Sequence, residues 1–206
     1  MRTLVIETAT AACSVALLED AAVLDSRHVV VGRGHAERLV PMIAELPGHG
    51  RADRILVDCG PGSFTGVRVG LAAARGLAIG WGVEVLGFSS LALVAAGAFA
   101  RASSTDTLAV VLEGGHGELF VQEFATDPLR ETGSFASLRP EAARERLGDL
   151  PVVGNGVHRL LAIDPAIAAS EALPDARDAL LLPAALATLA PRPIYGRAPD
   201  AKPPQP

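Results

Sequence analysis

One acid and three hydroxyl side chains gather in a short segment near the N-terminus, where the hydroxyl groups could contact a phosphate. They follow the apolar segment Leu4–Ile6, and a second extended segment begins at the last of them, so the pattern predicts a strand, a turn and a strand. The four residues are Glu7, Thr8, Thr10 and Ser14. The segment contains no glycine, which makes close backbone approach to a phosphate harder. These residue types favour a structural turn capped by its own hydroxyl groups, with a phosphate site as the alternative.

A glycine-rich segment, residues 60–66 (GPGSFTG), lies between an apolar strand-like run and a predicted helix that extends to Ile79. Ser63 or Thr65 could cap that helix, and a helix N-terminus can bind an anion. No Gly-Lys-Ser/Thr sequence follows, so the segment is not a Walker A loop. Each glycine inside a helix costs about 1 kcal/mol relative to alanine. The small residues that recur along this helix therefore suggest a close contact, which we expect another subunit to make.

Catalytic patterns are missing from the rest of the sequence. None of the five histidines forms an HxxxH or HExxH pair, so His35 and Glu37 do not indicate a zinc site. There is no Gly-x-Ser-x-Gly elbow. Cys13 and Cys59 lie in apolar surroundings, which predicts two buried, reduced thiols. The polar residues at 113–118 are most simply a solvated turn. We therefore predict no catalytic residue and no metal site.

The elements that position these residues follow from hydrophobic periodicity. The first half predicts an antiparallel meander of three strands, a helix with an internal proline, a strand, the small-residue helix, a strand and an apolar helix. The second half also begins with a strand, a small-residue turn and a strand, which hints at internal duplication. The predicted helices span residues 35–46, 65–79, 91–99, 137–147 and 178–190.

The composition supports one globular chain of two lobes. Half of the 206 residues are hydrophobic but only 4% are aromatic, so the core must pack through small and branched side chains. A net charge of −5 argues against autonomous binding to nucleic acid. We see no signal peptide and no apolar run of membrane-spanning length, and expect a soluble, cytoplasmic protein. The lobe boundary is placed in a small polar segment, giving domains 1–101 and 102–206.

Several segments together resemble one known family. The most specific is the run at 60–70 (GPGSFTGVRVG), and further support comes from the N-terminal run at 6–17 (IETATAACSVAL), from His35–Glu37 with the residues after it, and from segments at 87–91, 113–120 and 193–202. The chain resembles the TsaB (YeaZ) family over nearly its whole length. The family usually carries Asp where this chain has Glu7, which weakens any nucleotide site there.

The resemblance implies an actin-like (Hsp70-like, ASKHA) two-lobed α/β fold in which each lobe is a mixed sheet with flanking helices. It implies a non-catalytic dimerisation subunit that supports TsaD, the paralogue that makes N6-threonylcarbamoyladenosine at position 37 of tRNAs reading ANN codons. It further implies the ATPase TsaE as a partner, a homodimer when the chain is alone, contact with tRNA only through the complex, and no membrane. No cofactor of its own is implied beyond weak ATP or ADP contact in the complex.

The resemblance also places the pairing surface on two helices of the first lobe. The implied interface residues are His35, Glu37, Leu39, Met42, Ile43, Leu46, Thr65, Gly66, Val69, Gly70, Ala73 and Leu77. Glu7, Thr8, Thr10 and Ser14 would be a vestigial nucleotide site. The alternative is an enzyme of the same fold, either an ATP-binding kinase-like protein or a glycoprotease-like peptidase.

Overall fold

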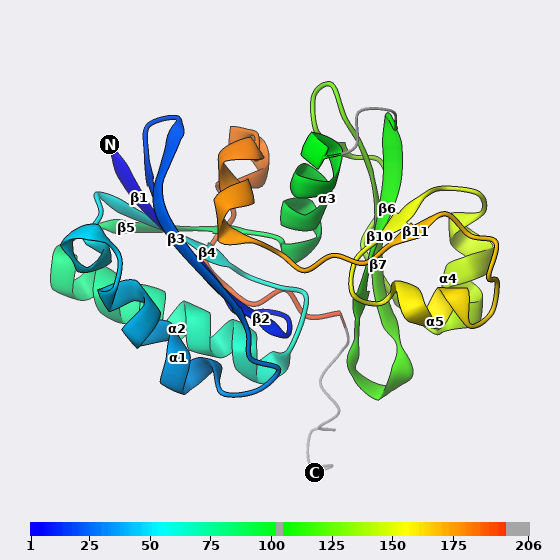
Figure 1. The fold of residues 1–206 in the computed structure, drawn as a ribbon, viewed down its shortest axis with the longest axis horizontal. Coiled ribbons are helices and arrows are strands. Elements are labelled where there is room, and N and C mark those ends of the chain that lie inside the picture. The colour runs from blue at the N-terminus through cyan, green and yellow to red at the C-terminus, as the bar shows by residue number, and fades with distance from the viewer. Residues whose placement is uncertain (102–104, 197–206) are drawn as a thin grey trace, which may run out of the picture.

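The computed structural model describes residues 1–101 and 105–196 and contains two sheets (Figure 1). The elements of the first part are β1 (Arg2–Glu7), β2 (Ala12–Glu19), β3 (Ala22–Val30), α1 (His35–Ala44), the 3-10 turn η1 (Pro47–Gly50), β4 (Arg54–Asp58), α2 (Phe64–Trp81), β5 (Glu84–Phe88) and α3 (Ser90–Arg101). The five strands are ordered β3-β2-β1-β4-β5. The first three strands pair antiparallel, which confirms the predicted meander, and β4 and β5 join in parallel.

The second sheet repeats this plan. Its elements are β6 (Thr107–Glu113), η2 (Gly115–Gly117), β7 (Leu119–Ala125), β8 (Arg130–Glu131), β9 (Ala136–Leu138), α4 (Pro140–Leu147), β10 (Val152–Val153), α5 (Val157–Leu161) and β11 (Ala169–Ser170). Strands β9, β7, β6, β10 and β11 pair in the same order and directions as β3, β2, β1, β4 and β5. The predicted internal duplication is therefore confirmed at the level of topology, and with it the actin-like, two-lobed α/β fold.

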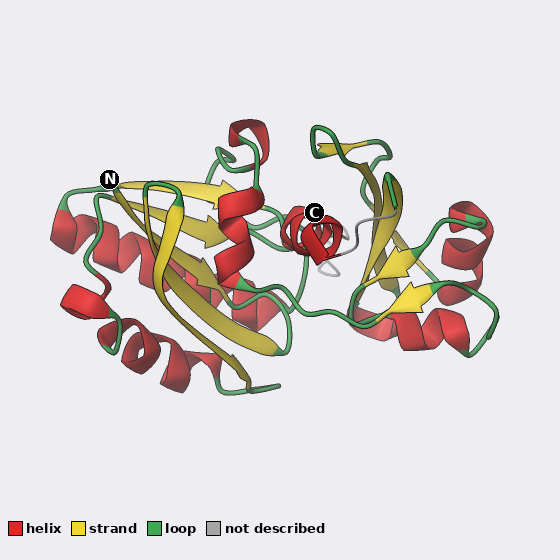
Figure 2. Ribbon diagram, turned by 45° about the horizontal axis from the view of Figure 1, so that its top comes forward, coloured by secondary structure: helices red, strands yellow, loops and turns green. Residues whose placement is uncertain are grey.

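The hydrophobic core forms three clusters, of which one lies between the two sheets and one lies on the outer face of each sheet. Helices α1 and α2 cover the outer face of the first sheet, and α4 and α5 cover the outer face of the second (Figures 1 and 2). Helix α3 packs between the sheets, and its residues from Ser90 to Gly97 are all buried. This burial on every side explains why the helix is almost entirely apolar in sequence.

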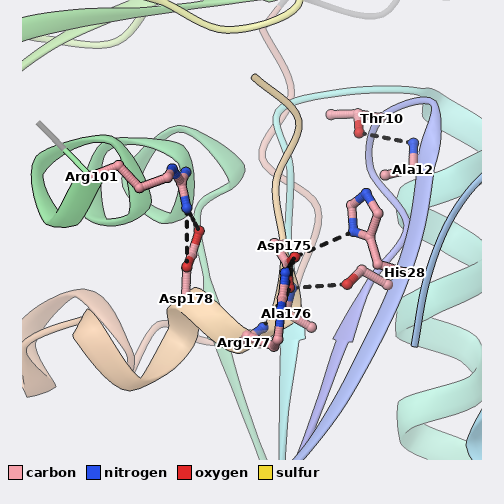
Figure 3. A network of polar contacts seen from close by, with 9 residues as sticks. Thr10, Ala12, His28, Arg101, Asp175, Ala176, Arg177 and Asp178 are labelled. Atoms are coloured by element: carbon pink, nitrogen blue, oxygen red, sulfur yellow. Dashed lines mark hydrogen bonds and ion pairs between the residues drawn. The ribbon is translucent and has the colours of Figure 1, made fainter. Parts of the chain in front are cut away.

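After β11 the chain returns to the first sheet through two 3-10 turns, η3 (Ala176–Leu181) and η4 (Ala184–Leu186). The backbone N–H of Ala176 donates to the Ser14 hydroxyl of β2 at 3.0 Å, and Arg101 of α3 forms an ion pair with Asp178 at 3.1 Å (Figure 3). The C-terminal segment thus packs on β2 and α3. The predicted boundary between residues 101 and 102 adjoins residues 102–104, which are outside the described part, and it stays a prediction.

Two predicted helices are wrong in extent or in kind. The helix expected from Ser137 begins only at Pro140, because the residues before it pair with β7 as strand β9. The helix expected over 178–190 is replaced by η3 and η4. Pro183 lacks an N–H and holds Leu182 in an extended conformation, and Leu189 instead exchanges backbone hydrogen bonds with Gly87 of β5.

The helix predicted over 35–46 ends at Ala44, and Pro41 lies inside it. The last part of the chain, predicted to be extended and frayed at its end, falls outside the described residues from position 197 onward. Up to Gly196 the tail is extended, and the Ile194 N–H donates to the carbonyl of Cys59 at 2.7 Å.

Candidate functional site

Two carboxylates lie inside the first lobe at the ends of neighbouring strands. Glu7 ends β1 and Asp58 ends β4, and their side chains are 0% and 1% exposed. Glu7 Oε1 accepts from the Ala9 N–H at 2.7 Å, and Asp58 Oδ1 accepts from the Gly60 N–H at 2.6 Å and the Ser90 hydroxyl at 2.8 Å. Burial raises the pKa of Asp58 to about 7. Burial, and after it the charge of Asp58, raises the pKa of Glu7 well above its usual range.

Asp58 was not identified from the sequence, where it is a single acid at the end of an apolar strand. The pairing of β1 with β4 brings it beside Glu7, since Ile6 is opposite Val57 and the two acids come next. A signal was nevertheless present, because an acid two residues before the glycine of a turn can accept the N–H of that glycine.

The hydroxyl residues of the first hairpin contact the chain itself. The Thr8 hydroxyl donates to the Gly66 carbonyl at 2.7 Å, and Thr10 Oγ1 accepts from the Ala12 N–H at 3.2 Å. The Ser14 hydroxyl accepts the hydrogen bond from the Ala176 N–H of the C-terminal segment (Figure 3). The structure thus brings the four predicted residues together in one hairpin, and their contacts support the interpretation as a structural turn.

The glycine-rich segment does begin a helix, as predicted. Ser63 is the N-cap of α2 and its side chain accepts from the Gly66 N–H at 3.2 Å. The Ser63 N–H donates in turn to the carbonyl of Ala9 at 2.6 Å, so the start of α2 is fixed against the first hairpin.

Two glycines of α2, Gly66 and Gly70, serve this internal contact. A Cβ on Gly66 would collide with the Thr8 carbonyl, and one on Gly70 would lie 2.5 Å from Thr8 Oγ1. Both glycines are buried. The interpretation that Gly66 and Gly70 leave room for another subunit does not match this packing, because the close neighbour is the chain's own hairpin. A bulky residue at Gly70 would therefore disturb the fold of the chain itself.

The other predicted interface residues divide by exposure. His35, Leu39, Met42, Ile43 and Leu46 are buried and pack inside the first lobe. Glu37 and Thr65 are exposed, while Val69, Ala73 and Leu77 are half-buried. The outer face of α1 and α2 also exposes apolar residues that were not singled out, chiefly Val40 at 58% and Ile79 at 85%. Helical spacing located the two helices but could not say which side of each faces the sheet.

A cavity of about 740 Å³ lies where the two hairpin turns meet the start of α2. Its wall includes Thr10 of the first turn, His116 and Asn155 of the second lobe, and the tail residues Ile194 to Gly196. At this wall the Arg68 guanidinium lies 3.2 Å from the centre of the Phe64 ring and donates to the Tyr195 hydroxyl at 3.0 Å. This cluster fastens the tail to α2.

The second hairpin turn is held by polar contacts of its own. The backbone N–H of Glu113 donates to Asn155 Oδ1 at 3.0 Å, and the Glu113 carboxylate lies 3.5 Å from His158 and 3.6 Å from Arg159. Glu118 accepts from the Ser137 hydroxyl at 2.7 Å. His116 has a positive φ of 59° in this turn. These contacts agree with the interpretation of 113–118 as a polar turn.

Both cysteines are buried and unpaired, as predicted. Burial raises the pKa of each thiol to about 11. Only about one thiol in a thousand would then be ionised at pH 8.

We therefore expect neither Cys13 nor Cys59 to react with Ellman's reagent at pH 8 in the folded protein, and both to react once guanidinium unfolds it. Free N-acetylcysteine under the same conditions provides the reference rate. Labelling of either residue in the native protein at a rate near this reference would contradict the burial of the thiols.

Within residues 1–101 and 105–196, no group of three or more His, Cys, Asp or Glu side chains is placed to hold a metal ion. No helix in that same part of the chain has the length and apolar character needed to cross a membrane.

Comparisons with known proteins agree with this architecture. The model of the family described as "TsaD: tRNA N6-adenosine threonylcarbamoyltransferase" matches residues 29–134. The protein named tRNA threonylcarbamoyladenosine biosynthesis protein TsaB of Escherichia coli is 36% identical over 171 residues, which cover 76% of this chain and 72% of that protein. An uncharacterized protein of Mycobacterium tuberculosis is 33% identical over 97% of this chain and 93% of its own length. The solved structure described as YeaZ from Pseudomonas aeruginosa superposes with a TM-score of 0.81 at 30% identity, covering 94% of this chain and 99% of that one.

The duplicated sheets and the hairpin packed on α2 define a two-lobed protein of the actin-like class. Within that class, the chain belongs to the TsaB (YeaZ) family.

Proposed function

We propose that this chain is the non-catalytic pairing subunit of the machinery that makes N6-threonylcarbamoyladenosine at position 37 of tRNA, where it supports a TsaD-type partner. The observation that carries the proposal is the correspondence, along most of the chain, with proteins named TsaB and YeaZ. The match of residues 29–134 to a TsaD-type domain further supports a paralogous pair, because two chains of like fold can pair through equivalent faces.

The proposed pairing surface is the outer face of α1 and α2. It combines the predicted residues that are accessible, Glu37 and Thr65 with the half-buried Val69, Ala73 and Leu77, and the exposed apolar side chains Val40 and Ile79. A surface on which large apolar residues alternate with small ones suits another helix pair. The buried members of the predicted set would act by shaping these helices from within.

The remaining parts of the proposal concern partners and setting. A TsaE-type ATPase would join the complex, and the isolated chain would use the same face to form a homodimer. The net charge of −5 fits a subunit that meets tRNA only through its partner. We also propose a cytoplasmic location and no cofactor of its own, with ATP or ADP contacting the chain weakly, and only in the complex.

The test is reconstitution with the TsaD-type and TsaE-type proteins of the same organism. Modified adenosine is measured by mass spectrometry of digested tRNA, with and without this chain. We expect modification to require the chain, and the chain alone to hydrolyse neither ATP nor peptides. Equal modification in its absence, or turnover by the isolated chain, would exclude the proposed role.

A further inference from the structure

The pair formed by Glu7 and Asp58 has a feature that its hydrogen bonds do not explain. Each carboxylate has one oxygen that accepts hydrogen bonds: Glu7 Oε1 accepts from Ala9 of its own turn, and Asp58 Oδ1 accepts from Gly60 of its own turn and from Ser90 at the start of α3. The other oxygens, Glu7 Oε2 and Asp58 Oδ2, are buried and have no hydrogen-bond partner in the described part of the chain. An unpaired buried carboxylate oxygen is costly, and two neighbouring ones that both carry charge are more so.

A single proton would remove both problems. It would neutralise one of two adjacent buried acids and supply a donor between two acceptors that otherwise lack one. We propose that Glu7 and Asp58 share one proton in the folded protein, held between Oε2 and Oδ2, and that this proton joins the ends of β1 and β4.

Among the described residues, the groups around the pair do not supply an alternative positive charge. The thiols of Cys13 on β2 and Cys59 after β4 are neutral, since burial raises the pKa of each to about 11. Asp175, before η3, adds a third negative charge toward Glu7.

Although burial opposes it, the pKa of Asp175 is lowered by Arg177 and, to a smaller extent, by His28 (Figure 3). The Arg177 guanidinium is therefore already paired with Asp175, at 2.7 Å. Arg38 on α1 acts on the pKa of Cys13 and Arg75 on α2 acts on that of Cys59, in each case against the effect of burial.

The proposed proton has a structural consequence for the two turns at the cavity. Glu7 fixes the N–H of Ala9, Asp58 fixes that of Gly60, and the two turns meet where the Ser63 N–H donates to the Ala9 carbonyl. Loss of the proton would place a second negative charge between the turns and push them apart. The start of α2 and the wall of the cavity would loosen together.

The sign of the pH dependence follows from the raised pKa of both acids. The unfolded chain releases both carboxyl protons near pH 4, whereas the folded protein keeps the shared proton until about pH 7, the pKa to which burial raises Asp58. The stabilisation is complete below the unfolded pKa and is lost as pH rises through the folded one. One extra proton in the folded state changes the unfolding equilibrium constant by at most about tenfold per pH unit.

The experiment compares Glu7→Gln and Asp58→Asn with the wild-type chain by urea denaturation from pH 5 to pH 8.5. Each amide can donate where the proton lies, so each variant mimics the protonated pair, and only the one acid that remains in it can still titrate. We expect the unfolding equilibrium constant of the wild type, divided by that of either variant, to rise by up to about tenfold per pH unit between pH 5 and pH 7. The control is Glu84→Gln, which changes an exposed acid in β5. The unfolding equilibrium constant of this variant should change with pH in the same way as that of the wild type.

Ratios that stay constant across this range for both variants would overturn the proposal. If either variant fails to fold, carbon-13 NMR of the carboxyl groups in wild-type protein decides. We expect two coupled signals, of which one completes its titration only at pH 7 or above. Completion of both titrations below pH 5 would show two independently ionised acids and no shared proton.

Discussion

Replacing Gly66 with alanine should lower the free energy of unfolding by about 3 kcal/mol, whereas the same replacement at Gly76 should raise it by up to about 1 kcal/mol. Both glycines lie in α2, so the helix propensity gained is the same. They differ in what a methyl group would meet. At Gly66 it would collide with the Thr8 carbonyl, which is backbone and cannot move aside, while at Gly76 no atom lies within 4 Å.

The first substitution should also break the hydrogen bond from the Thr8 hydroxyl to the Gly66 carbonyl, because α2 has to shift away from the hairpin. Urea denaturation of the two variants beside the wild-type chain measures both effects. If Gly66→Ala were as stable as Gly76→Ala, the helix would have to stand further from the hairpin than this structure places it.

The opposite signs expected at these two glycines also show where sequence reasoning ended. Small residues at helical spacing correctly indicated a close contact along this helix. Small residues on both sides of the helix look alike in sequence, however, so the pattern does not show which side faces the sheet and which faces outward. The contact was therefore assigned to another subunit, although Gly66 and Gly70 face Thr8 of the same chain.

Much of the fold could be predicted because its signals are local. Short extended segments joined by short turns predict the meander, a glycine-rich turn predicts the start of α2, and an unbroken apolar run predicts α3, which is buried between two sheets. The failures are non-local. Residues 136–138 become a strand because β7 is available to pair with them, and Leu189 leaves a helical pattern because Gly87 offers backbone partners.

The same division applies to the candidate site. Glu7 was recognised because it ends a strand before a turn rich in hydroxyl groups. Asp58 has a comparable position, but its importance arises only when β4 pairs with β1 and both acids become buried. Burial, which raises the pKa of each, is a property of the assembled sheet and the layers around it, and no spacing within either segment encodes it.

Replacing Ile79 with glutamate should weaken pairing with the TsaD-type partner by about 100-fold and leave the fold intact. Ile79 is 85% exposed on the outer face of α2, so the monomer loses almost no buried surface. In the proposed interface the new carboxylate would be buried without a partner, a cost that for a central apolar residue reaches 2 kcal/mol or more.

The matched control is Ile163→Glu, which makes the same change at an exposed isoleucine just after α5 in the second lobe. Titration calorimetry measures the affinity of both variants, and thermal unfolding checks that each is folded. If Ile79→Glu binds the partner with wild-type affinity, the interface does not include this face of α2. Equal weakening by Ile163→Glu would instead point to the added negative charge, since both variants carry it and only one carries it on the proposed surface.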